Sequence, residues 1–264
     1  MANNPAFNNP AFKNGGQMQA ASAAMTAEQL QHQYDQPMAS VDVTDRMTIE
    51  DTVVKTAVAF VVMLATAAIG WNMPGIMLPA ALIGFVLAMV NIFKKVPSAP
   101  LVLAYAAVQG LFVGALSAYF ETAWPGIVVQ AVIATFAVVG VTLALFASGK
   151  VRASKKATKI FMVAMIGYLV YSLVNMVLMM TGVVSGFGMS SATIGNTGIP
   201  IGAVLGIFVV ILAAYSLVLD FDSIQRGVQN RAPKVYAWAG AFGIMVTVIW
   251  LYTELLRFFA ILRD

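Results

Sequence analysis

Four ionisable residues near the C-terminus lie in surroundings that are unusual for charged groups. Asp220 and Asp222 follow an apolar run in LVLDFDSIQRG, and Glu254 and Arg257 lie within WLYTELLRFFAIL. An ionisable side chain inside a lipid bilayer is costly and marks a functional position unless a membrane interface explains it. If Asp222 met Glu254 at a low-dielectric site, the two carboxylates would share a proton, because both cannot easily stay ionised. Such a pair is a proton switch, and when open it offers the hard oxygen ligands that suit Ca²⁺.

The two aspartates have a second interpretation. They are ordinary cytoplasmic loop charges if their helix ends at Leu219. A helix that continues through Gln229 instead places Asp222 about two turns inside its cytoplasmic end, facing the other helices. Both interpretations stay open at the level of the sequence.

Glu254 also has two interpretations. Arg257, three residues on, would pair with it along one helix face. A contact with Asp222 requires tilted helices or a deeper helix start, because Glu254 lies 19 residues beyond Val235, or about 28 Å along a helix. We keep Asp222 and Glu254 as candidate pH-sensing and Ca²⁺-binding residues, with Asp220, Arg257 and Glu121 as accessory candidates. For Glu121, at the end of another apolar run, snorkelling to water is the favoured explanation.

Composition indicates the element type that positions these residues. The chain has 264 residues, of which 60% are apolar and 10% are charged, whereas a soluble domain averages about 25% charged residues. The apolar residues form runs of about 20, the length of a helix that crosses about 30 Å of hydrocarbon. Strands with open edges would leave backbone groups unpaired in lipid. The sequence therefore predicts an all-α integral membrane protein.

Seven transmembrane helices are expected within a domain that covers residues 47–264. Their expected ranges are 52–70, 73–93, 98–120, 125–147, 160–181, 199–219 and 235 to about 262. In the third range, small residues recur every four positions and predict close helix packing. These residues are Ala106, Gly110, Gly114 and Ala118, and Gly202 and Gly206 repeat the spacing in the sixth range.

Basic residues alternate between the connections and predict the orientation. Twelve lie beside the start of the first helix and in the connections after the second, fourth and sixth, against only Arg257 and Arg263 on the other side. The positive-inside rule then places the N-terminus in the cytoplasm and the C-terminus outside. The net charge of +4 reflects this topology and attraction to the lipid bilayer, so no nucleic-acid partner is expected.

Residues 1–46 are expected to be a disordered cytoplasmic tail, because they are rich in Asn, Gln and Ala and show no sustained period. Order is predicted to begin near Met47, where Thr48 and Asp51 have the spacing of a capping box. The chain has no cysteine, and its single histidine, His32, lies in the tail. Thiolate metal sites, haem and Ser–His catalysis within the membrane are therefore excluded, and we expect no enzyme and no resident cofactor.

Three stretches resemble the Bax-inhibitor family, also called the transmembrane Bax inhibitor motif family, in its bacterial YccA-like branch. They read AYAAVQGLFVGALSAYFE, GIVVQAVIATF and LDFDSIQRGVQNRAPKVYAWAGAFGIMVTVIWLYTELLRFFAIL. The resemblance implies six helices around a central last helix and a bacterial plasma-membrane location. It also implies a pH-sensitive Ca²⁺ leak controlled by acids on the sixth and seventh helices.

The family motifs assign these acids to two residues. Asp222 matches the acid of the Phe-Asp-Thr segment, with Ser in place of Thr, and Glu254 matches the acid of the Leu-Tyr-Leu-Asp segment, with Glu in place of Asp. The second predicted helix contains no arginine, so an arginine latch of the kind known in the family would use another residue or be absent. The expected function is a Ca²⁺ leak protein. The alternative is a non-conducting regulator that binds another membrane protein, such as a quality-control protease.

Overall fold

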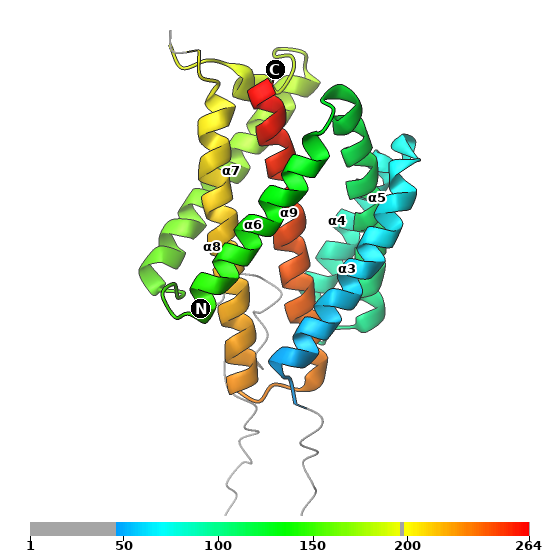
Figure 1. Ribbon diagram of the computed structural model, residues 1–264, viewed down its shortest axis with the longest axis vertical. Helices are drawn as coiled ribbons and strands as arrows, with labels where there is room; N and C mark the ends of the chain where they lie inside the picture. The colour runs from blue at the N-terminus through cyan, green and yellow to red at the C-terminus, as the bar shows by residue number, and fades with distance from the viewer. Residues whose placement is uncertain (1–45, 196–197, 264) are drawn as a thin grey trace, which may run out of the picture.

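The computed structural model describes residues 46–195 and 198–263, so the predicted N-terminal tail lies outside the described residues apart from Arg46. Seven helices in the described part are long and apolar enough to cross a membrane, which confirms the predicted all-α fold (Figure 1). These helices are α3 (Ile49–Trp71), α4 (Met77–Phe93), α5 (Ala99–Ala123), α6 (Ile127–Ala147), α7 (Lys155–Met180), α8 (Ile201–Gln229) and α9 (Ala237–Arg263). Three short 3₁₀ turns join them, η3 (Pro74–Ile76), η4 (Gly188–Ser191) and η5 (Lys234–Tyr236).

The two ends of the helix bundle differ in charge. Figure 1 shows the start of α3 and the α8–α9 turn at one end, and the C-terminus with the α7–α8 connection at the other. The first end also holds the connections after α4 and α6, since Lys94 lines a small pocket with Ala239, and Arg152 donates to Gln225 Oε1 at 2.6 Å. We call it the basic end and the opposite one the C-terminal end.

Helix α8 runs ten residues beyond Leu219, as the longer of the two predicted alternatives requires. Asp222 and Arg226 form an i,i+4 ion pair within this extension. Arg226 also lies in the last turn, where a cation interacts favourably with the helix dipole. The helix ends before Pro233, which cannot continue it.

Helix α9 is the most enclosed of the seven. Sixteen of its 27 residues are buried, and it packs against α3, α5, α6 and α8. In Figure 1 it passes through the middle of the bundle. A helix that is apolar on all sides is stable in such a position, because it meets protein in every direction. The last helix is therefore central, as the family resemblance implies.

Helices α3 and α5 touch through their backbones. A Cβ atom added to Gly110 would overlap the Met63 carbonyl, and one added to Gly114 would overlap the Ala67 carbonyl. Gly70 of α3 lies equally close to Leu111 of α5. This confirms the predicted role of the small residues in the third helix, which let two helices approach closely in lipid.

Helices α8 and α9 lie antiparallel in a fixed register. A Cβ on Gly206 would meet Phe258, and one on Gly240 would meet Ile224. Between these levels, Thr247 of α9 contacts Asp220 of α8. The contact residues are 14 and 4 residues apart on α8 and 7 and 11 residues apart on α9, and each of these intervals returns to nearly the same side of a helix.

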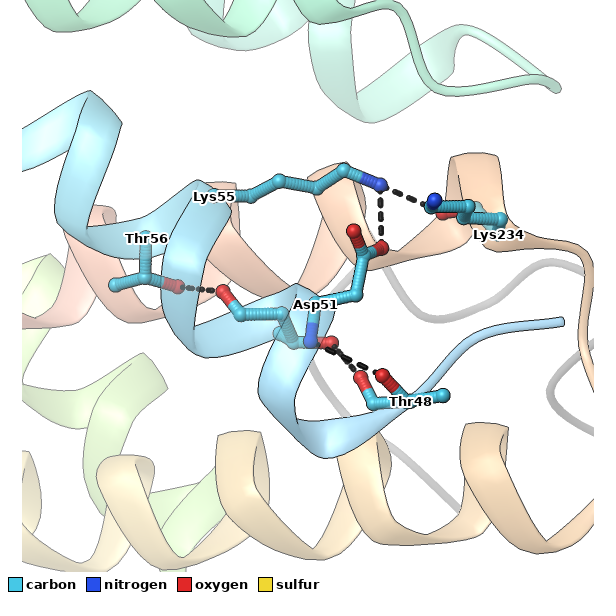
Figure 2. Close-up of polar contacts among 6 residues, drawn as sticks. Thr48, Asp51, Lys55, Thr56 and Lys234 are labelled. Atoms are coloured by element: carbon cyan, nitrogen blue, oxygen red, sulfur yellow. Dashed lines mark hydrogen bonds and ion pairs between the residues drawn. The ribbon is translucent and has the colours of Figure 1, made fainter. Parts of the chain in front are cut away.

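Polar contacts fasten the start of α3 to the α8–α9 turn (Figure 2). The Thr48 side chain accepts from Asp51 N, which confirms this part of the predicted cap. Lys55 Nζ lies 2.6 Å from Asp51 Oδ2 and donates to Lys234 O at 3.0 Å. Met47 N donates to Ala232 O at 2.8 Å. The first described residues and the α8–α9 turn therefore form one unit.

Replacing Gly114 with alanine is expected to destabilise the protein, because the new Cβ would overlap the Ala67 carbonyl and force α3 and α5 apart. Overpacking of this kind costs about 1–3 kcal/mol. Gly140→Ala in α6 is the matched control, since nothing lies within 4 Å of its Cβ position. Thermal unfolding in detergent should show a lower midpoint for Gly114→Ala than for the wild type, and an unchanged or higher one for Gly140→Ala. Equal midpoints for the two variants would contradict the close contact.

Candidate functional site

Asp220 is a completely buried carboxylate in the middle of the α8–α9 interface, with 0% of its surface exposed. Thr247 Oγ1 of α9 donates to its Oδ2 at 2.6 Å, and Ser216 Oγ lies 3.3 Å from the same threonine hydroxyl. Ser216, Asp220 and Ser223 are spaced four and three residues apart, so they share one face of α8. The hydroxyl of Ser223 is buried and has no hydrogen-bond partner. Oxygen atoms therefore gather around Asp220 inside an otherwise apolar interface.

Asp222 lies closer to the basic end and has a different environment. Its carboxylate pairs with Arg226 of the same helix, and 17% of its side chain is exposed. Two residues correspond to about 200° around a helix, so Asp222 points away from the face that carries Asp220. Arg152, on the neighbouring connection, donates to Gln225 Oε1 three residues further on. Asp222 therefore belongs to a partly exposed group of charged and polar side chains at the basic end.

Glu254 has its partners on α7 and on its own helix. Tyr168 of α7 donates a hydrogen bond to Glu254 Oε1 at 2.5 Å. Arg257 Nη2 lies 2.7 Å from Glu254 Oε2 and donates to Tyr168 Oη at 2.7 Å. The three side chains form a closed triangle, which we call the Glu254 triad. Of the two predicted interpretations of Glu254, the local pair with Arg257 is confirmed.

The structure does not bring Asp222 and Glu254 together. Thr247, which contacts Asp220, lies seven residues from Glu254 along α9, or about 10 Å. Asp222 lies two residues beyond Asp220 toward the basic end, which adds about 3 Å. The two predicted acids are thus separated by about 13 Å along the helix axis. The shared proton of a direct pair is absent from this conformation, because each acid pairs with an arginine of its own helix.

Asp220 and Glu254 instead lie along one line. Thr247 and Glu254 are seven residues apart, so they occupy the same face of α9. Tyr252 Oη and Ser117 Oγ of α5, which are 2.7 Å apart, lie on another side of α9, because Tyr252 is two residues, or about 200°, from Glu254. The side chains of Thr247 and Glu254 therefore lie on one side of the central helix, at the level of Asp220 and at the level of the Glu254 triad.

Glu121 has a local structural role. Its carboxylate accepts from Gly126 N at 2.6 Å and from Val128 N at 3.0 Å. These groups belong to the first turn of α6, where backbone N–H groups lack partners within the helix and favour an anion. Glu121 caps α6 rather than facing the α8–α9 interface, and snorkelling alone does not explain its position.

Two residues of the site were not singled out from the sequence. Thr247 was not selected, although its spacing of seven from Glu254 places both on one helix face. The second is Tyr168, whose phenol joins α7 to α9. Among residues 46–195 and 198–263, no group of three or more Asp, Glu or His side chains could hold a metal ion.

Comparison with known proteins identifies one family. The family model described as Bax inhibitor 1 like matches residues 4–264, nearly the whole chain. No curated protein sequence matches the chain. The match confirms the family that the sequence predicts, and the bacterial YccA-like branch stays a prediction.

Replacing Glu254 with glutamine is expected to destabilise the protein by about 2–3 kcal/mol, because Arg257 loses its counter-charge inside the bundle. This value is below that of a fully buried pair, since 26% of the Arg257 side chain is exposed. Asp222→Asn is the control, because a partly exposed helix pair contributes less than about 1 kcal/mol. Unfolding followed by circular dichroism in detergent should show a clearly lower stability for Glu254→Gln than for Asp222→Asn. The reverse order would contradict the triad.

Proposed function

The chain belongs to the Bax inhibitor 1 like family, and from this premise we propose that it is a Ca²⁺ leak protein whose ion path follows the α8–α9 interface. The family resemblance supports the type of transport, and the shared side of α9 that carries Thr247 and Glu254 supports the path. Asp222 with Arg226 marks the entrance at the basic end. Asp220 and then the Glu254 triad are the next two positions along the proposed ion path.

The burial of Asp220 is the single observation that carries the proposal. A carboxylate inside a membrane helix is costly and faces a partner or an ion pathway. The hydroxyl of Thr247 donates to it, and Ser216 Oγ lies 3.3 Å from that hydroxyl. Carboxylate and hydroxyl oxygens are hard ligands for Ca²⁺. A stable Ca²⁺ site takes six to eight oxygens, so a smaller set favours passage over storage.

Protonation of Asp220 supplies the pH dependence in this proposal. At lower pH the neutral carboxyl group offers no charge to a cation, so flux falls. At higher pH the carboxylate is charged and attracts Ca²⁺, so flux rises. Thr247 of α9 donates to this carboxylate and Ser216 of α8 lies beside the threonine hydroxyl, and neither hydroxyl titrates in this range. Asp220 thus takes the place that a direct Asp222–Glu254 pair had in the sequence-based hypothesis.

We place the protein in the bacterial plasma membrane with its basic end in the cytoplasm. Lys94, Lys150 and Lys155 lie in or beside connections at this end. The positive-inside rule favours the cytoplasmic side for short basic loops. The ion path then leads from the C-terminal end, outside the cell, to Asp222.

Purified chain in proteoliposomes is expected to conduct Ca²⁺, with a flux that rises as the pH increases. Asp220→Asn removes the charge and keeps the size of the side chain, so we expect about tenfold less flux, as for a barrier raised by about 1.4 kcal/mol, and a flat pH profile. Asp222→Asn is the matched control and should keep the wild-type pH profile, because its carboxylate is already paired with Arg226 in partly hydrated surroundings. Flux is measured with a Ca²⁺ indicator inside the vesicles.

Two results would overturn the proposal. The first is a wild-type chain that inserts into the vesicles and is correctly folded but conducts no Ca²⁺. The alternative function, a non-conducting regulator that binds a membrane protein, would then replace the proposed one. If Asp220→Asn conducts with the wild-type pH profile, the path does not pass Asp220. Correct folding of each variant is checked by its unfolding midpoint in detergent.

Single cysteines test the orientation, because the chain has none of its own. In intact cells, a membrane-impermeant maleimide should label Thr181→Cys at the C-terminal end of α7 and leave Lys156→Cys, at its basic end, unlabelled. Both positions are exposed, so accessibility within the protein does not separate them. Labelling of Lys156→Cys alone would invert the proposed topology.

A further inference from the structure

The connection between α7 and α8 folds back onto the bundle at the C-terminal end. Ser190 is 1% exposed, and Gly188 is also buried. Both belong to η4, a single 3₁₀ turn with the sequence Gly-Met-Ser-Ser. Phe187 and η4 together, residues 187–191, are called the plug below.

Side chains of α7 hold the plug through three hydrogen bonds. Asn175 Oδ1 accepts from Met189 N at 2.7 Å, and Asn175 Nδ2 donates to Phe187 O at 3.2 Å. Tyr171 Oη and Ser190 Oγ are 2.8 Å apart. The amide of Asn175 is therefore matched to two backbone groups of the plug.

The plug lies over the end of the α8–α9 interface. A Cβ on Gly202, at the start of α8, would lie 2.8 Å from Ser190 O and 2.7 Å from Ile261 Cδ1 of α9. The ring of Phe187 packs on Trp124, at the end of α5, with centroids 5.7 Å apart. The plug therefore touches the ends of α5, α7 and α8 and lies close to α9.

The Glu254 triad lies directly beneath this contact. Tyr171 is three residues beyond Tyr168 on α7, and Ile261 is seven residues beyond Glu254 on α9. Both offsets keep the residues on one helix face, about 5 Å and about 10 Å further toward the C-terminal end. On both helices, the plug therefore occupies the layer between the triad and the end of the bundle.

Gly188 differs from Gly182 of the same connection, because a side chain at position 188 would collide with Asn175. Its φ of +68° favours glycine, and a Cβ there would also overlap Asn175 Oδ1. Gly182 has a similar φ of +71°, but nothing lies within 4 Å of its Cβ position. Both glycines thus have a positive φ, but only Gly188 lies close to Asn175, at the contact between the plug and α7.

We propose that residues 187–191 are a removable plug that docks on Tyr171 and Asn175 and closes the C-terminal end of the path to the Glu254 triad. The α7 anchors are neutral hydrogen bonds at the end of the bundle, where water can replace them when the plug leaves. Helix α7 itself is held loosely, since only Phe161 and Asn175 are buried among its 26 residues. Elements with few buried contacts open locally while the rest stays folded. The effect of the plug on Ca²⁺ flux rests on the proposed function, whereas docking and release do not.

The first experiment measures docking without reference to flux. Ser190→Cys is the only cysteine of its chain, and its reaction with a maleimide is timed in lipid nanodiscs, where both faces are accessible. A plug that undocks gives a slow but complete reaction. Adding Gly188→Ala should speed it about tenfold by weakening the docked state, and adding Gly182→Ala, the matched control, should leave it within about twofold. No reaction at all, or equal rates with both alanines, would show a fixed cap and overturn the proposal.

The second experiment locks the plug. A Cβ on Gly188 would lie 2.9 Å from Asn175 Cγ, so cysteines at positions 175 and 188 meet within disulfide reach. In proteoliposomes, the oxidised double variant should conduct Ca²⁺ about tenfold more slowly than after reduction, while Asn175→Cys alone should not respond to the reductant. Equal flux before and after reduction of a formed disulfide would overturn the gating role. If the wild type conducts nothing, the proposed function fails, and the nanodisc labelling still decides whether the plug exists.

Discussion

A carboxylate inside hydrocarbon has no water to solvate it, and the arrangement of α7, α8 and α9 depends on this constraint. Asp220 accepts a hydrogen bond from the hydroxyl of Thr247. Glu254 accepts one from Tyr168 and forms an ion pair with Arg257. Each acid thereby joins two helices or completes a triangle of side chains. Leaving either group unpaired would cost several kcal/mol, so the acids determine which faces of these helices meet.

The bundle combines two kinds of packing. Glycines at positions 70, 110 and 114 bring α3 and α5 into backbone contact, and α9 is enclosed on most sides. Close-packed regions of this kind deform little. Helix α7 is attached differently, by Tyr168, Tyr171 and Asn175. The bonds of Tyr168 are to the charged Glu254 and Arg257, whereas those of Tyr171 and Asn175 are neutral and contribute only about 1 kcal/mol each. Movement therefore needs less energy at the level of Tyr171 and Asn175 than at the level of Tyr168.

The helices and the local ion pairs could be predicted from the sequence, whereas the partners across helices could not. Apolar runs indicate the spans, and the spacing of Asp222 and Arg226 accounts for the continuation of α8. The choice between Asp220 and Asp222 as the inward acid depends on the rotation of α8 about its axis. A shift of two residues turns a side chain by about 200°. The local signal is the spacing of two serines, Ser216 four residues before Asp220 and Ser223 three residues after it. The docking of Ser190 has no periodic pattern at all, since it depends on the tertiary contacts of a connection.

The anchoring of Met47 has a mechanical consequence. Arg46 forms an isolated bridge with Pro233, and the Met47 side chain is buried against the residues of the α8–α9 turn. A load applied to the chain ahead of Arg46 therefore reaches this turn before it reaches α3. The α8–α9 turn transmits this force to the start of α9. Pulling on the N-terminal segment therefore acts directly on the helix that carries Glu254.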